Sequence, residues 1–127
     1  AIALNLKLKI FKQEHVKRNY IANYYLKNIK NKKIKLPVVV KNFSHAWHLF
    51  IIRCKKRDQL KRYLFKNRIK TMIHYPIPPH KQKAYENYKN LKLPITERLS
   101  KHVLSLPLST TLRESELKYI INKINKF

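Results

Sequence analysis

Hydrophobic residues at helical spacing predict a long helix at the start of the chain. Leu4, Leu8, Phe11 and His15 fall on one helical face, and no proline interrupts the segment. Four more apolar or aromatic positions follow at similar spacing: Ile21, Tyr24, Tyr25 and Ile29. The pattern predicts one helix over residues 4–30. Because it begins without a capping residue, and with Ala rather than Met, we expect the sequence to be a fragment of something longer.

A second amphipathic helix is predicted at the end of the chain. Four aliphatic residues repeat there at i, i+3, i+4 and i+7: Leu117, Ile120, Ile121 and Ile124. Thr111 and Glu114 have the spacing of a capping box, and we expect this pair to begin the helix. The first and last helices are expected to pack together.

The middle of the chain predicts strands alternating with short helices. Runs rich in aromatic and β-branched residues predict strands at residues 47–54, 69–77 and 103–108, the first buried on both faces. Helices are predicted at residues 58–67, 80–88 and 94–102, the last two after prolines. Residues 32–44 would form a loop or an extended connection.

These elements predict a small α/β (α+β) domain. We expect about three strands, mostly antiparallel or mixed, covered on one side by helices. The length of 127 residues suits a single domain, residues 1–127, without an internal repeat. No apolar run approaches the about 20 residues that span a bilayer. The single Cys54 excludes an internal disulfide and favours the cytoplasm.

The chain is strongly basic, with 30 Lys and Arg against six acidic residues and a net charge of +24. Such a surface attracts nucleic acid and other polyanions. The first 57 residues contain one acid, Glu14, so any such patch belongs to that half. A coding bias toward Lys, Asn and Ile would give the same composition, and no helix-turn-helix, zinc-finger or RNA-recognition signature is present. Both interpretations stay open.

Three residues outside the helices have metal-binding or nucleophilic chemistry. His45 and His48 have a spacing that can ligate zinc, but no cysteine or carboxylate cluster accompanies them, so packing or capping is expected and no metal site is predicted. Basic neighbours could activate Cys54 as a nucleophile. Because no other member of a triad is evident, we expect a half-buried structural thiol and no catalytic residue.

The strongest candidate site is the proline-rich segment at residues 71–82, TMIHYPIPPHKQ. Its prolines stiffen the backbone around His74, Tyr75 and His80, which carry proton-transfer and hydrogen-bonding groups. A rigid loop of this kind can place polar groups in a binding site. The alternative, that the prolines only rigidify the end of a strand, stays open on these residues alone.

Six motifs, in order along the chain, resemble the C-terminal domain of the DegT/StrS family of sugar-nucleotide aminotransferases. They are AIAL at 1–4 with Leu8, HAWHLF at 45–50, RDQL at 57–60, IKT at 69–71, HYPIPPH at 74–80 with Gln82, and LSLP at 104–107. The resemblance covers the whole chain but only the last third of a typical member. It implies the C-terminal part of a fold type I aminotransferase, an enzyme that uses pyridoxal phosphate.

The resemblance also implies a substrate and a site. The HYPIPPH form is most similar to enzymes that make 3-amino-3,6-dideoxyhexoses on a dTDP carrier. His74 and Tyr75 would lie near the sugar-nucleotide pocket at a dimer interface, with His80 as a neighbour. Family members usually have Gly after the Asn that ends the second helix, whereas here Arg68 follows Asn67. A non-Gly residue at that positive φ costs about 1 kcal/mol, so this corner is expected to be strained or reshaped.

The cofactor machinery is missing from the sequence. Pyridoxal phosphate needs a Schiff-base lysine, an acid for its pyridinium nitrogen and a phosphate cup. No lysine lies in a Schiff-base motif like that of the family, and Asp58 is the only Asp. We expect the chain alone to bind no cofactor and to be inactive. Its parent would transfer an amino group from glutamate to a keto-sugar nucleotide for surface polysaccharide. The alternatives are a basic nucleic-acid or polyanion-binding protein and a decayed remnant.

Overall fold

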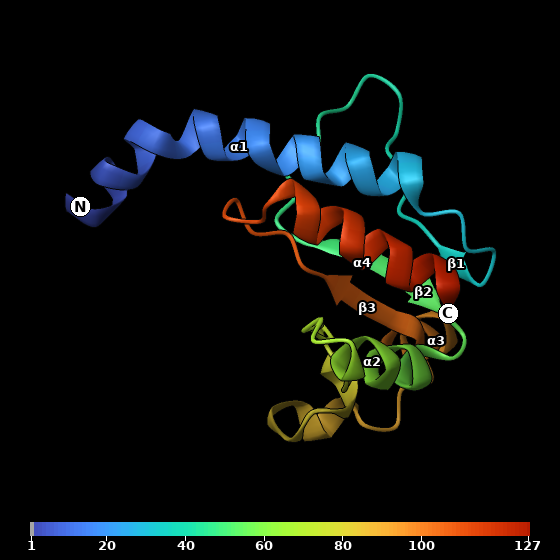
Figure 1. Cartoon of the computed structure of the whole chain (residues 1–127). Coiled ribbons are helices and arrows are strands. Elements are labelled where there is room, and N and C mark those ends of the chain that lie inside the picture. Colours follow the sequence, from blue (N-terminus) through green and yellow to red (C-terminus); the bar gives the residue numbers. More distant parts are fainter. Residues whose placement is uncertain (1) are drawn as a thin grey trace.

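The computed structural model describes residues 2–127 (Figure 1). The α-helices are α1 (Ile2–Asn28), α2 (Arg57–Lys66), α3 (Pro94–His102) and α4 (Glu114–Lys126). The strands are β1 (Ile34–Lys35), β2 (Phe50–Cys54) and β3 (Val103–Leu106), and the 3₁₀ helices are η1 (Pro79–Lys81) and η2 (Lys83–Tyr88). Ala1, where the family resemblance begins, lies outside the described residues.

The sheet is antiparallel throughout, with β2 in the centre and the order β1-β2-β3. Phe50 pairs with Leu106 and Ile52 with Leu104, so these four side chains share one face of the sheet. This confirms the predicted three-stranded, mostly antiparallel domain. Burial alternates along β2, because Arg53 on the opposite face is exposed, and the expectation of a strand buried on both faces was wrong.

Three helices pack on the apolar face of the sheet. In Figure 1, α4 lies in front of the sheet, with α1 above it and α2 below it. Their buried residues and those of the strands form one hydrophobic core, in which the rings of Tyr25 and Phe50 are 4.9 Å apart. The predicted packing of the first and last helices is confirmed, since Asn125 on α4 donates a hydrogen bond to the carbonyl of Asn28 at the end of α1.

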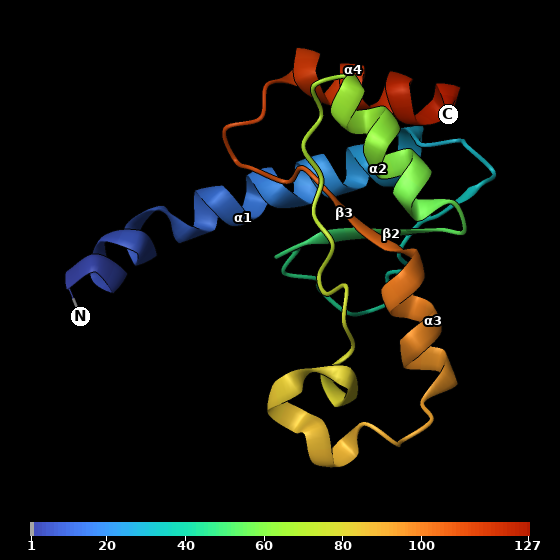
Figure 2. The same ribbon diagram turned by 90° about the horizontal axis from the view of Figure 1, so that it is seen from below.

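Only the second half of α1 belongs to this core. Ile21, Ala22 and Tyr25 are buried, whereas Leu4, Leu8 and other apolar residues of the first half are exposed. Figure 2 shows this half extending away from the body of the fold. The prediction of a long helix is confirmed. No helix in residues 2–127 has the combination of length and apolar character that crossing a membrane requires.

Two predicted strands differ from those observed. The first starts at Phe50 rather than at residue 47, because Trp47 has a φ of 47° and turns its ring into the core. Residues 69–77 form no regular strand. Among them only Met72 pairs with β3, through two backbone hydrogen bonds of 2.7 and 3.2 Å to Ser105 of that strand. The third strand is β1, within the predicted loop, where Ile34 pairs with Cys54.

Two predicted helices also differ from those observed. The N-cap of α4 is Arg113, whose backbone N–H donates to the Glu116 carboxylate over 2.9 Å. The predicted pair of Thr111 and Glu114 was therefore wrong by two residues. The helix expected at residues 80–88 forms as η1 and η2 instead of an α-helix. Gln82, between the two short helices, is extended and Tyr85 is non-helical, so no continuous α-helix forms.

Candidate functional site

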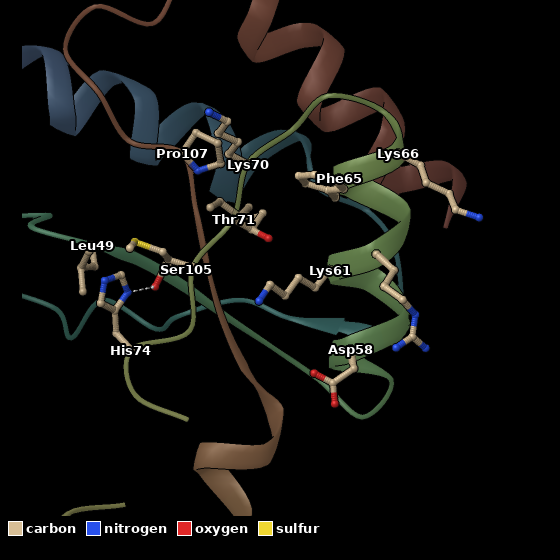
Figure 3. A pocket seen from close by; sticks show the side chains of 13 residues that line it. Leu49, Asp58, Lys61, Phe65, Lys66, Lys70, Thr71, His74, Ser105 and Pro107 are labelled. Carbon is tan, nitrogen blue, oxygen red and sulfur yellow. Dashed lines mark hydrogen bonds between the residues drawn. The ribbon is translucent and has the colours of Figure 1, made fainter. Parts of the chain in front are cut away.

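The main cleft of the described chain lies between α2, residues 70–74 and β3 (Figure 3). Its volume of about 1050 Å³ is at the upper end of the range for small-molecule sites. The apolar lining comes from several segments: Leu49, Phe65, Met72, Leu106 and Pro107. Such a hollow can hold an apolar or aromatic group while the polar side chains at its edge fix the orientation.

One face of α2 supplies the charged wall of the cleft. Five residues at helical spacing line it: Asp58, Lys61, Arg62, Phe65 and Lys66. Figure 3 shows Lys61 reaching into the cleft and Lys66 pointing away from it. Across the cleft, Lys70 adds a further cation. Because Asp58 is the only acid in this lining, the wall favours an anionic ligand.

Asp58 is held by its neighbour at the start of α2. Its carboxylate lies 2.6 Å from Nε of Arg57, close enough for an ion pair although the N–H is not aligned for a hydrogen bond. Arg57 is buried and donates from Nη1 to the carbonyls of Ser100 and Val103 at the end of α3. A cation at this position also stabilises the C-terminus of that helix. The RDQL motif therefore joins α2 to α3.

His74 forms the wall opposite α2. Its Nδ1 lies 2.9 Å from Oγ of Ser105 on β3, and the bond orients the half-buried imidazole (Figure 3). The pairing of Met72 with Ser105 holds the backbone that leads to His74. Thr71, the residue before Met72, also lines the cleft, and its Oγ1 is buried without a hydrogen-bond partner. The cleft thus contains an oriented imidazole on the wall opposite α2.

The three predicted site residues lie in three different environments. Tyr75 is 70% exposed and outside the cleft lining, with its ring edge-on to His74 at 5.6 Å. His80 is only 6% exposed, and its Nε2 lies 3.1 Å from the Glu97 carboxylate on α3. His74 and Tyr75 are together, but His80 is part of a separate contact that fixes η1 to α3. A substrate role for each of the three stays a prediction.

The contact of His80 changes the titration of its partner. The hydrogen bond from His80 is the main cause that lowers the pKa of Glu97, and the backbone N–H of Leu93 adds to it. Lys81 lies 4.0 Å from the same carboxylate. This arrangement holds the proline-rich segment against α3 as long as Glu97 is ionised.

Two of the three residues considered for metal or nucleophilic chemistry, His45 and Cys54, have structural roles here. Nδ1 of His45 accepts a hydrogen bond from the Trp47 backbone N–H, and the two rings stack at 4.0 Å. This confirms the expected packing and capping role. Cys54 is buried more completely than expected, at the end of β2. His48 is exposed, and residues 2–127 include no group of three potential metal ligands.

Comparison with known proteins identifies the family. Residues 1–125 match the model of the DegT/DnrJ/EryC1/StrS aminotransferase family. The chain belongs to this family. A dTDP-3-amino-3,6-dideoxy-alpha-D-galactopyranose transaminase from Aneurinibacillus thermoaerophilus is 41% identical over the entire chain, which corresponds to 35% of that relative. The chain thus spans about a third of the length of the relatives it matches.

Solved structures of DegT/DnrJ/EryC1/StrS aminotransferases confirm the fold. The crystal structure of S. venezuelae DesV in complex with a ketimine intermediate superposes with a TM-score of 0.92 and 30% identity, over 98% of this chain and 34% of DesV. A family member from Brucella abortus gives a TM-score of 0.89 with 34% identity, over the same shares. The chain therefore has the fold of the C-terminal third of a fold type I aminotransferase.

Family members depend on pyridoxal phosphate, and the described residues do not fit that group by themselves. A Schiff-base lysine is shielded from solvent, whereas no lysine in residues 2–127 is buried. Asp58, the single Asp, is paired with Arg57 at the rim of a cleft, so it is not free to hold a pyridinium nitrogen. No step of the family chemistry can be derived through the cofactor on this chain alone.

The cationic wall on α2 is the feature that the sequence motifs did not reveal. Lys61 and Arg62 were not among the predicted site residues, because one more Lys or Arg has little weight in a chain of charge +24. The spacing of residues 58, 61, 62, 65 and 66 is the signal that would have found this wall, since it places them on one helical face.

Proposed function

We propose that this chain is the C-terminal domain of an aminotransferase that moves an amino group from glutamate to a keto-sugar nucleotide of the dTDP-3-keto-6-deoxyhexose type. The observation that carries the proposal is the family match over residues 1–125, together with the 41% identity to a dTDP-amino-sugar transaminase. Residues 1–127 would form one domain of the parent enzyme. The pathway would supply surface polysaccharide, and Cys54, a free thiol, fits the cytoplasm.

In this proposal, the rest of the parent supplies the cofactor site. When bound there, pyridoxal phosphate would act as the electron sink that makes the amino-group transfer possible. The chain itself would be inactive. Its contribution would be the cleft between His74 and the cations of α2, which would orient an anionic sugar nucleotide. Tyr75, being exposed beside His74, would contact the substrate once another surface closes over it.

Exposed apolar residues on α1 suggest a contact with another part of the parent protein. Ile2, Leu4, Leu8 and Val16 are each exposed by more than 60%. Isolated exposed apolar residues are ordinary, but several of them concentrated on one projecting half-helix indicate a surface that another part of the protein covers. We propose that the remaining two thirds of the parent, or the partner subunit of a homodimer, packs there.

A chimera tests the proposal. The chain replaces the C-terminal third of the transaminase from Aneurinibacillus thermoaerophilus, and transfer from glutamate to a dTDP-3-keto-6-deoxyhexose is measured. We expect turnover by the chimera and none by the chain alone. The native transaminase is the positive control, and absorbance of bound pyridoxal phosphate confirms assembly. A chimera that folds and binds the cofactor but transfers no amino group would overturn the substrate assignment.

A further inference from the structure

We propose that the chain binds a compact oligophosphate, a short run of linked phosphate groups, in a second cleft between β1, the end of β2 and α3. This cleft has a volume of about 640 Å³ and shares no lining residue with the cleft that contains His74. Seven Lys or Arg side chains and His102 line it, and none of the six acidic residues of the chain does. The proposal concerns binding only and goes beyond the aminotransferase function.

Two of these cations are placed directly opposite each other by the sheet. Lys35 on β1 pairs with Arg53 on β2 in the antiparallel register, and both side chains are exposed. Like charges directly opposite on neighbouring strands are destabilising. A bound anion that lies between the two side chains would offset this repulsion.

The other walls add cations from three more segments. The turn after β2 supplies Lys55 and Lys56, and the turn before β1 supplies Lys32. On α3, Arg98 and His102 are four residues apart, so both lie on the helical face toward the cleft. The charge therefore converges on one hollow from elements that are far apart in the sequence.

These charges are not balanced within the described part of the chain. Lys33 donates a hydrogen bond of 2.7 Å to the carbonyl of Phe127. The remaining six, Lys32, Lys35, Arg53, Lys55, Lys56 and Arg98, form no ion pair with a carboxylate of residues 2–127. Clefts lined by one sign of charge focus the electric field and concentrate ions of the opposite sign. Several closely linked phosphates match several converging cations better than one phosphate does.

The lining favours an oligophosphate over single-stranded nucleic acid. Proteins that bind single strands combine a positive groove with aromatic side chains on which bases stack. Apart from its Lys and Arg residues and His102, this cleft is lined only by Cys54 and Leu99, and no Phe, Tyr or Trp lines it. Its volume is within the range of small-molecule sites, about 300–1,000 Å³. The ligand would thus be recognised through its phosphates.

The test is calorimetric titration of the full 127-residue chain with inorganic tripolyphosphate, orthophosphate and a dT oligonucleotide at physiological salt. We expect tripolyphosphate to bind at least tenfold more tightly than either of the others. The variant R53Q/R98Q should weaken tripolyphosphate binding at least tenfold. The control variant K9Q/K41Q, which removes two exposed charges elsewhere, should change it less than twofold.

Circular dichroism confirms that each variant folds. If R53Q/R98Q does not fold, K55Q/K56Q in the exposed turn replaces it with the same expected loss. Equal weakening in the cleft variant and the control would mean that the net charge binds the anion, and it would overturn the proposal. Tighter binding of the dT oligonucleotide, with the same sensitivity to R53Q/R98Q, would replace the oligophosphate by nucleic acid and would also overturn it.

Discussion

Nδ1 of His74 lies 2.9 Å from Oγ of Ser105, although the two residues are 31 positions apart in the sequence. The bond connects the proline-rich segment to β3 at the wall of the main cleft. Because Ser105 is buried and His74 is half-buried, the imidazole has a fixed orientation before any ligand arrives.

A double-mutant cycle should detect this bond. We expect His74→Ala and Ser105→Ala to show a coupling energy of about 0.5–1.5 kcal/mol, the usual net value of one hydrogen bond. The free energies of unfolding from urea titrations of the two single variants and the double variant give the value. Additive effects would mean that the two side chains act independently.

In the chimeric enzyme, His74→Ala and Tyr75→Phe should reduce sugar turnover more than they reduce stability. The reason is that both side chains belong to the proline-rich segment, residues 71–82, and we propose that they contact the substrate. Turnover and thermal unfolding are measured on the same preparations. Tyr85→Phe, a change at another exposed tyrosine on η2, is the control and should leave both unchanged. Unaltered turnover in both site variants would remove them from the site.

Arg68 should be a point of stored backbone strain. It has a φ of 60°, so the corner after α2 keeps the positive φ that was expected from the family pattern, without glycine. Replacing it with Gly should stabilise the chain by about 0.5–1 kcal/mol, because Gly has no Cβ to clash in this conformation. The free energy of unfolding measures the change. Arg68→Ala should bring no such gain, and equal stability of the Gly and Ala variants would contradict the explanation.

The contact between His80 and Glu97 predicts a dependence of stability on pH. The folded-state pKa of Glu97 is lowered, so its contribution is fully present above the unfolded value of about 4.3 and is lost as the pH falls through the lower folded value. The melting temperature of Glu97→Gln should therefore fall less than that of the unaltered chain below this pH.

Glu86→Gln is the control for this experiment, since Glu86 makes only an exposed ion pair with Lys89. Its melting temperature should follow the unaltered chain at every pH. Identical acid sensitivity of Glu97→Gln and the unaltered chain would show that the contact with His80 does not contribute to folding.

The buried hydroxyl of Tyr25 should contribute to the free energy of unfolding. Its side chain is fully buried, its O–H donates to the carbonyl of Pro107 over 2.9 Å, and burial raises its pKa. Tyr25→Phe should cost about 0.5–1.5 kcal/mol, because it leaves that carbonyl without its partner. Tyr119→Phe, at an exposed tyrosine with a longer bond of 3.3 Å, should cost less. Equal losses in urea unfolding would contradict the role of burial.

Local signals in the sequence predicted the four α-helices and the family, but not the division of residues 80–88 into η1 and η2. Periodic apolar residues in α4 and the proline at the start of α3 are local signals, because they depend on the geometry of one or two turns. The ordered motifs from residue 45 to residue 107 indicate the aminotransferase family through the identity and order of their residues alone. They also indicated the positive φ at Arg68.

Which residues lie together in space became visible in the tertiary structure alone. It showed that residues 69–77 contribute one bridge at Met72 instead of a strand, because pairing depends on the hydrogen-bonding groups of β3. It also showed that His80 contacts Glu97 on α3 and does not line the cleft that contains His74. Lys35, Arg53 and Arg98 line a second cleft together. Periodicity along a chain reports which face of an element a residue occupies. Contacts between elements depend on register and packing, which no local pattern encodes.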